Sequence, residues 1–202
     1  MTALFDLTTP VVPAPVPQPA AGATPRPLVI GLDPSLTSCG IAGADWADAL
    51  RPRRTHARGH LRLSWLRTQI ADRTRAADLV VIEGPSYGHG AMAGHHEMAG
   101  LWWLITHDLW RREIPYAVCP PSQRAMYATG KGNAAKGAVR DGVRTHFGIE
   151  CDGPGRYDMA DAASMAHLGL HWLGYPTTEL PPTHTRALTG VQWPTQTVAV
   201  AQ

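Results

Sequence analysis

Two short apolar runs, each ending in a carboxylate, constrain the fold of this chain more than any other feature. Residues 28–33 (LVIGLD) end in Asp33, and residues 78–84 (DLVVIEG) carry Glu83 at the same place, with a proline close behind each acid. Runs of this length between turn residues are typical of buried strands. A buried carboxylate is costly unless a partner offsets its charge, and a divalent cation is one such partner. Asp33 and Glu83 are therefore candidate metal ligands.

The rest of the chain predicts one α/β domain between two tails. Residues 1–27 carry seven prolines, which favours a disordered or polyproline-like tail, and the folded domain is expected over 28–175. Residues 176–202 are rich in threonine and proline without periodicity, so a second, mobile tail is expected there. Within the domain, the pattern predicts strands at 39–44, within 54–60 and at 114–119, and helices at 61–77, 95–112, 122–127, 136–147 and 158–172.

The net charge of +2 excludes no class of partner, but the arginines are unevenly distributed. Eight of them lie between residues 51 and 75. Such a basic block suits a polyanion such as nucleic acid, and it is equally compatible with a solvated arginine-rich face. Charge alone therefore leaves both interpretations open.

The cysteines and the hydropathy pattern bear on the compartment. Cys39, Cys119 and Cys151 are odd in number and widely spaced, which favours free thiols in a reducing compartment over a disulfide framework or a zinc finger. No apolar stretch approaches the length of a membrane-spanning helix, and the N-terminus lacks the pattern of a secretory signal. The expected location is the cytoplasm, with no membrane partner.

A second pair of carboxylates falls on the last predicted helix. Asp158 and Asp161 are three residues apart, so they share one face of that helix, where a cation would relieve their repulsion. Sites in α/β sheets form at the carboxyl ends of strands, where these acids could join Asp33 and Glu83. Four carboxylates can hold two hard cations at the ~3.5–4 Å spacing used in phosphodiester chemistry. Taken singly, each acid also has a structural explanation: a turn before proline, an arginine pair, or a helix N-terminus.

Three motifs in order carry a family resemblance. Residues 30–35 (IGLDPS) resemble the first motif of RuvC-type Holliday junction resolvases, residues 80–85 (VVIEGP) the second, and residues 158–163 (DMADAA) the last. The run 127–136 (YATGKGNAAK) is similar to phage-type members in particular. The resemblance extends over about residues 28–173.

The resemblance implies an RNase H-like fold, a mixed five-stranded sheet flanked by helices. It implies a homodimer that nicks two symmetry-related strands of a four-way or otherwise branched DNA, leaving 5′-phosphate and 3′-hydroxyl ends. Asp33, Glu83, Asp158 and Asp161 would bind two Mg²⁺ ions per site, with Mn²⁺ able to substitute and Asp33 bridging both ions. Lys136 would be the basic residue at the scissile phosphate.

The DNA contacts and the subunit interface are further expectations. The residues expected to contact DNA are basic or aromatic: Tyr87, Lys131, Arg124, Arg53 and Arg54. Lys131 is also the alternative to Lys136 as the basic residue near the scissile phosphate. The predicted helix over 95–112 carries more large apolar side chains than one buried face can hold, so part of it is expected to form the dimer interface. Residues 84–87 (GPSY) depart from the apolar aromatic segment that is usual in the family.

The same sequence offers three other interpretations. A histidine cluster (His89, His95, His96) and the pair His167 and His171 are weak zinc signals, because adjacent histidines diverge on a helix and the H-E-x-x-H motif is absent. A sugar-kinase or actin-like ATPase shares the RNase H-like core, but it needs two such domains. A non-catalytic junction-binding protein, with structural acids, is the remaining alternative.

Overall fold

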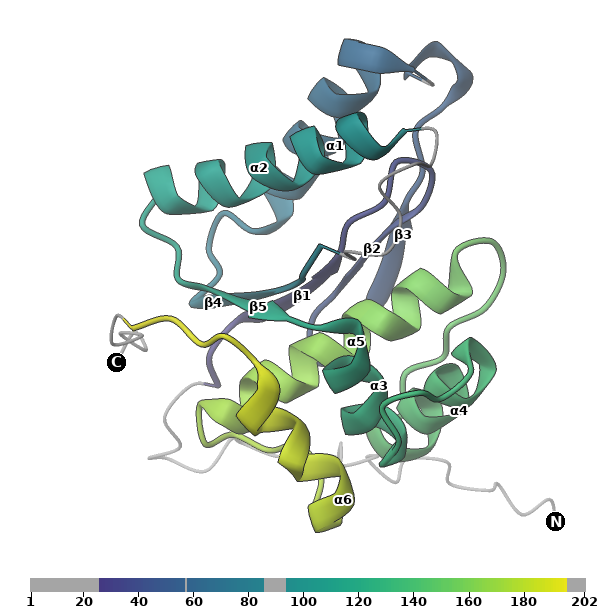
Figure 1. Ribbon diagram of the computed structural model, residues 1–202, viewed down its shortest axis with the longest axis vertical. Helices are drawn as coiled ribbons and strands as arrows, with labels where there is room; N and C mark the ends of the chain where they lie inside the picture. The colour runs from purple at the N-terminus through teal and green to yellow at the C-terminus, as the bar shows by residue number, and fades with distance from the viewer. Residues whose placement is uncertain (1–25, 57, 86–93, 196–202) are drawn as a thin grey trace, which may run out of the picture.

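The chain folds around a mixed five-stranded sheet, as expected from the sequence (Figure 1). The computed structural model describes residues 26–56, 58–85 and 94–195. The strands are β1 (Val29–Asp33), β2 (Cys39–Ala42), β3 (Ala47–Leu50), β4 (Leu79–Glu83) and β5 (Tyr116–Cys119), in the spatial order β3-β2-β1-β4-β5. Strands β1, β4 and β5 run parallel, whereas β2 and β3 are antiparallel to their neighbours.

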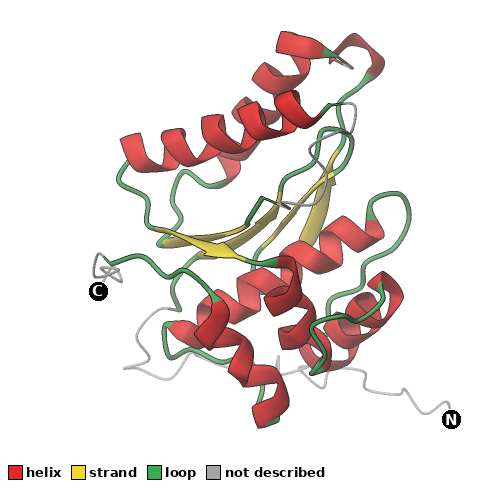
Figure 2. Cartoon of the chain, viewed as in Figure 1, coloured by secondary structure: helices red, strands yellow, loops and turns green. Residues whose placement is uncertain are grey.

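Helices cover both faces of the sheet (Figure 2). One face carries α1 (Gly59–Arg73) and α2 (His95–Arg111), and the other carries α3 (Pro121–Thr129), α4 (Lys136–Phe147), α5 (Arg156–Trp172) and α6 (Pro182–Thr185). Two 3₁₀ turns, η1 (Arg54–His56) and η2 (Arg186–Gly190), complete the described elements. Within the described residues, none of the helices combines the length and the apolar character that crossing a bilayer requires.

Strand alternation divides the core between the two faces. Ile30 and Leu32 of β1 pack with Leu66 and Ile105 of the α1–α2 layer. Val29 points the other way, into the cluster that includes side chains of α5. Side chains two residues apart along a strand point to the same face, so Asp33 lies on the α5 face of the sheet with Val29 and Gly31. The sequence of β1 therefore aims its terminal carboxylate at α5.

Helix α5 lies unusually close to β1 because Gly31 has no side chain. A Cβ built on Gly31 would lie 1.9 Å from the Ala162 carbonyl oxygen and 2.6 Å from the Ala166 amide nitrogen. These are backbone atoms, which cannot move aside without shifting the helix. The small residues of α5 and Gly31 together hold the second turn of α5 directly over the end of β1.

The third strand differs from its prediction. It lies at Ala47–Leu50 and not within 54–60, where Arg54–His56 instead forms a 3₁₀ turn. Alanine and aspartate favour strands weakly, so the local sequence hides this element. Its pairing with β2, from Cys39↔Leu50 to Ala42↔Ala47, supplies the stabilisation that local propensity lacks.

The C-terminal segment also differs, because residues 176–195 are not a free tail. They form α6 and η2, which pack against α3, and Gln192 pairs with Val118 beside β5. Trp193 stacks on Trp172 with ring centroids 4.6 Å apart. Contacts with residues distant in sequence, and not local periodicity, order this segment. Residues 196–202 and the predicted N-terminal tail up to residue 25 lie outside the described residues.

All three cysteines are buried free thiols, as predicted. Burial raises the pKa of Cys39, Cys119 and Cys151, so the thiolate forms are disfavoured. This agrees with a packing role and offers no reactive nucleophile.

Gly31→Ala is expected to destabilise the protein severely, since the added methyl group would overlap the α5 backbone. The cost should exceed the ~1–3 kcal/mol typical of overpacked cores, and it is measured by urea unfolding. Gly137→Ala in α4 is the matched control, because nothing lies within 4 Å of its added Cβ. The control should be as stable as the parent or slightly more so. Equal stability of the two variants would contradict the close-approach explanation.

Candidate active site: a carboxylate cluster at the sheet edge

Asp33 and Glu83 meet at the carboxyl edge of the sheet through strand register. β1 and β4 are parallel, and Leu32 is the register partner of Ile82. The next residues along, Asp33 and Glu83, therefore lie side by side on neighbouring strands that are about 4.8 Å apart. Asp33 is only 7% exposed, and the Glu83 side chain is 16% exposed. The two acids expected to share a site do so because of backbone pairing.

Helix α5 contributes the third carboxylate of this cluster. The close contact between Gly31 and Ala162 places Asp161 over the end of β1, where its side chain is 2% exposed. Asp158 lies one turn earlier and is half-buried. A Cβ on Gly40 would lie 1.9 Å from the Asp158 carbonyl oxygen, so β2 also holds the first turn of α5 closely. The predicted convergence of two strands and one helix is present in the structure.

Arg124 lies inside the cluster, between the acids. Its Nε donates to Glu83 Oε1 at 2.7 Å, and its Nη1 donates to Asp161 Oδ1 at 2.5 Å. The arginine is in the first turn of α3, which begins with Pro121 directly after β5 and so starts at the same sheet edge. Its side chain is only 12% exposed. The sequence predicts a DNA contact for Arg124, whereas in the structure its guanidinium pairs with two acids of the cluster.

Burial and mutual repulsion shift the acidity of the cluster. Burial raises the pKa of Asp33 well above its ordinary value, and the negative charge of Glu83 raises it further. Burial likewise raises the pKa of Asp161 to about 7, against the opposing effect of the Arg124 guanidinium. Burial disfavours the charged form of Arg124, but the charges of Glu83 and Asp161 outweigh this and raise its pKa. The single positive charge of Arg124 thus stabilises the three acids without fully neutralising them.

The donor set suits a hard divalent cation, while the arrangement of the side chains does not yet form a cage. Asp33, Glu83, Asp158 and Asp161 offer the carboxylate oxygens that Mg²⁺ prefers. The buried hydroxyl of Ser38, close to Gly155 and the start of α5, has no hydrogen-bond partner, so the surroundings hold unused polar capacity. No group of three or more histidine, cysteine or acidic side chains among the described residues is arranged to hold a metal ion. Arg124 occupies two of the oxygens that such an ion would need.

Lys136 is close to the cluster, and Lys131 is further along the same loop. Lys136 is the first residue of α4 and is exposed, and its positive charge acts to lower the pKa of Asp161. Lys131 is exposed as well, and its backbone amide donates to Thr129 Oγ1 at 3.2 Å. Of the two lysines, Lys136 has the electrostatic link to the acids.

The predicted DNA contacts are distributed unevenly. Arg53 and Arg54 are exposed on the segment between β3 and α1. Tyr87 lies outside the described residues. Part of the basic block has another role, since Arg62 pairs with Glu97 and Arg67 pairs with Asp108, which joins α1 to α2.

His167 and His171, one of the pairs weighed as zinc ligands, have packing roles instead, whereas His95 and His96 are exposed at the start of α2. His167 is buried, stacks on Phe147 at 4.0 Å and shares a hydrogen bond with Thr177 Oγ1 at 2.6 Å. His171 lies beside the Tyr127 hydroxyl at 3.2 Å. Both pairs of contacts hold α5 to its neighbours.

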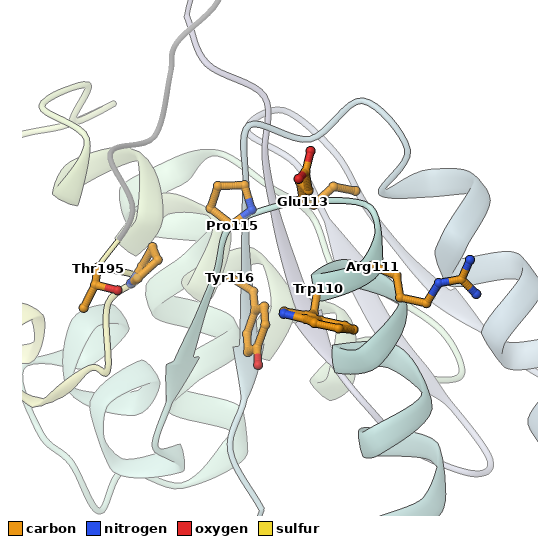
Figure 3. Close-up of a pocket in the computed structure, with 8 residues that line it drawn as sticks. Trp110, Arg111, Glu113, Pro115, Tyr116 and Thr195 are labelled. Atoms are coloured by element: carbon orange, nitrogen blue, oxygen red, sulfur yellow. The ribbon is translucent and has the colours of Figure 1, made fainter.

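A hollow of about 860 Å³ on the described surface lies away from the acids. It is lined by Trp110 and Arg111 at the end of α2, by Tyr116 at the start of β5, and by Thr195 (Figure 3). The acid cluster is at the carboxyl ends of the parallel strands, whereas Tyr116 begins β5. Concave shape alone therefore points to the opposite end of the sheet from the acids.

Comparison with known proteins bears on the fold. No protein-family model and no curated protein matches the chain. Among solved structures, Thermus thermophilus RuvC matches with a TM-score of 0.56 and 18% identity, covering 75% of this chain and 99% of that one. A T. thermophilus RuvC structure in complex with Holliday junction substrate matches with a TM-score of 0.53 and 19% identity, covering 76% and 99%.

The chain has the RuvC fold. This confirms the RNase H-like architecture that motif order suggested, and nearly the whole of the RuvC chain is accounted for in both matches. At such low identity the likeness establishes architecture and leaves the chemistry to the residues of this chain. Those residues place an acid cluster at the carboxyl edge of the RuvC-like sheet.

Asp33→Asn is expected to stabilise the protein in metal-free buffer, because it removes one of three crowded buried charges. The raised pKa of Asp33 means that the parent loses stability as pH rises from about 4 through the folded-state value. The gain should therefore be small at pH 5 and grow towards pH 8, where it should reach several degrees, since about 1 kcal/mol moves the melting temperature of a domain this size by roughly 2–4 °C.

The measurement is thermal unfolding with EDTA across that pH range. Asp48→Asn serves as the control, since that side chain is 57% exposed on the edge strand β3 and should show no such trend. A variant Asp33→Asn that melts below the parent at pH 8 would show that the cluster is not under electrostatic strain.

Proposed function

We propose that the protein is a metal-dependent, structure-selective endonuclease that resolves Holliday junctions or other branched DNA. The observation that supports this most is the convergence of Asp33, Glu83 and Asp161 at one sheet edge of a RuvC fold. Burying three acids together is costly for folding alone. Phosphodiester hydrolysis would account for such a cluster, because carboxylates hold the hard cations that in turn bind the phosphate oxygens.

The chain's own residues divide the work as follows. Asp33 and Glu83 are fixed by strand pairing, and Asp161 and Asp158 by the close packing of α5, so that the acids can hold two Mg²⁺ ions, or Mn²⁺ in their place. When bound, these ions supply an activated water and stabilise charge on the leaving 3′ oxygen. Lys136 adds positive charge beside the scissile phosphate. The expected products carry 5′-phosphate and 3′-hydroxyl ends.

The main competing function is non-catalytic junction binding. One observation favours it: Arg124 pairs with Glu83 and Asp161, as expected for a purely structural cluster in which no metal ion is needed. The two functions differ in what Asp33 does, because binding does not need a metal-holding carboxylate at that position.

A homodimer suits this function, because a four-way junction has two-fold symmetry. Helix α2 offers a surface for it: Trp103 and Trp110 are each 68% exposed and seven residues apart, so they lie on one face. Gly100 lies on the same side, and an added Cβ there would meet nothing within 4 Å, which leaves room for a second helix. We propose that this outer face of α2 is the subunit interface. A phage origin remains a prediction from motif likeness.

Asp33→Asn is expected to bind a labelled four-way junction with unchanged affinity and to cut it at least ~10³-fold more slowly than the parent in Mg²⁺. The loss is expected because the substitution removes the carboxylate at the end of β1, which lies beside β4 and under α5. Gel assays of binding and of cleavage, with EDTA to abolish cleavage by the parent, measure both quantities.

Asp48→Asn on the exposed edge strand is the matched control and should cut like the parent. If Asp33→Asn cuts at the parental rate, the nuclease function is wrong at this site. If the parent binds junctions but never cuts them with either Mg²⁺ or Mn²⁺, junction binding without catalysis is the better description.

Trp103→Glu combined with Trp110→Glu is expected to give a monomer, since charge would be buried at the centre of the interface. Light scattering at micromolar concentration should show the parent at twice the chain mass of 21.8 kDa and the variant at the chain mass. Leu61→Glu, at a side chain that is 63% exposed on α1, is the control and should remain dimeric. A monomeric parent would remove the symmetric model.

A further inference from the structure

We propose that Arg124 is a gate on the cation site, whose guanidinium closes the acid cluster until a divalent cation and the DNA backbone displace it. This inference rests on the proposed function for the identity of the cation site. It concerns how that site is loaded and not whether it exists.

The first step is that the guanidinium and a cation compete for the same oxygens. Arg124 donates to Glu83 Oε1 and to Asp161 Oδ1, and these acids come from β4 and α5, the two elements that flank Asp33. An ion held jointly by Glu83 and Asp161 would need lone pairs that the arginine now uses. Two positive groups also repel each other in a poorly solvated space. Pairing by Arg124 and cation binding are therefore mutually exclusive, or nearly so.

The second step is that one arginine cannot satisfy the cluster. Asp33, Glu83 and Asp161 carry three negative charges when ionised, against a single positive charge from Arg124. The half-buried Asp158 lies one helical turn away and adds to the excess. The closed site thus keeps a net attraction for cations, while the arginine lowers its apparent affinity, because only the open fraction can bind.

The third step is that the side chain can leave without disturbing the fold. The Arg124 carbonyl accepts a hydrogen bond from Ser164 Oγ at 2.7 Å, which fixes the α3 backbone to α5 independently of the guanidinium. Arg124 is at the start of α3, on the edge of the sheet where a phosphate would approach, and its side chain retains 12% exposure. A planar guanidinium released there is well suited to a backbone phosphate.

The proposed gate reconciles two roles of Arg124, the DNA contact predicted from the sequence and the pairing with acids seen in the structure. Arg124 was expected from the sequence to contact DNA, yet it is engaged with acids in the structure. With DNA present, a phosphate can take over the guanidinium and free the acids for the cation. The site would then load its metal most readily on a bound substrate, which limits cleavage when no junction is held.

The test is direct Mn²⁺ binding, by calorimetry and by electron paramagnetic resonance, to the full chain without DNA. Arg124→Gln should bind Mn²⁺ at least tenfold more tightly than the parent, a difference of about 1.4 kcal/mol. Arg124→Lys, which keeps the charge but loses the two-pronged geometry, should fall between them and covers the case in which the glutamine variant does not fold. Arg140→Gln is the matched control, because Arg140 pairs with the exposed Asp141 and should leave Mn²⁺ affinity unchanged.

The possible outcomes distinguish failure of the gate from failure of the proposed nuclease function. If the parent binds Mn²⁺ and both Arg124 variants bind it equally or more weakly, the gate is refuted and the nuclease site stands. If neither the parent nor the variants bind Mn²⁺ at millimolar concentration, the metal site itself is refuted, and the gate with it. Tighter binding by Arg124→Gln, with Arg124→Lys between it and the parent and Arg140→Gln unchanged, supports the gate.

Discussion

The ion pairs of Arg124 with Glu83 and Asp161 hold the rest of the site in its present form. They join the first turn of α3, the end of β4 and the second turn of α5, three elements far apart in sequence. Without a positive charge among them, the buried Asp33 and Asp161 beside the partly buried Glu83 would be strongly unfavourable, since each unpaired buried charge costs several kcal/mol. The cluster is stable enough to form but remains short of positive charge, and this deficit is the physical basis of the cation site that we propose.

The fold positions the acids through backbone geometry. Parallel pairing of β1 with β4 sets Asp33 beside Glu83, and the missing side chain of Gly31 lets α5 approach closely enough to deliver Asp161. Neither feature depends on a mobile loop. The RuvC-like sheet therefore presents a preorganised set of carboxylates, and the adjustable parts are the long side chains at its rim, Arg124 and Lys136.

Much of this could be predicted from the sequence, for reasons that particular residues make clear. The strands ending at Asp33 and Glu83 and the paired acids of α5 carry strong local patterns, so their elements and their meeting point were correctly expected. Strand β3 could not be found, because Ala47 and Asp48 favour no strand until they pair with β2. The order of residues 182–192 was hidden for the same reason, since it comes from contacts with α3 and from the pairing of Gln192 with Val118 of β5. The position of Arg124 within the cluster depends on side-chain geometry in three dimensions, which no local pattern reveals. The sequence showed only that Arg124 is basic and lies in the predicted helix over 122–127.

The central claim is that the acids around Arg124 form a cation site. It is tested most directly by a crystal structure of the protein grown with Mn²⁺, with anomalous scattering collected above the manganese absorption edge. The account predicts an anomalous peak within about 2.0–2.4 Å of carboxylate oxygens from Asp33 and Asp161, with the Arg124 guanidinium moved away from Glu83. A map with no peak there, and Arg124 still bridging Glu83 and Asp161 at saturating Mn²⁺, would contradict it.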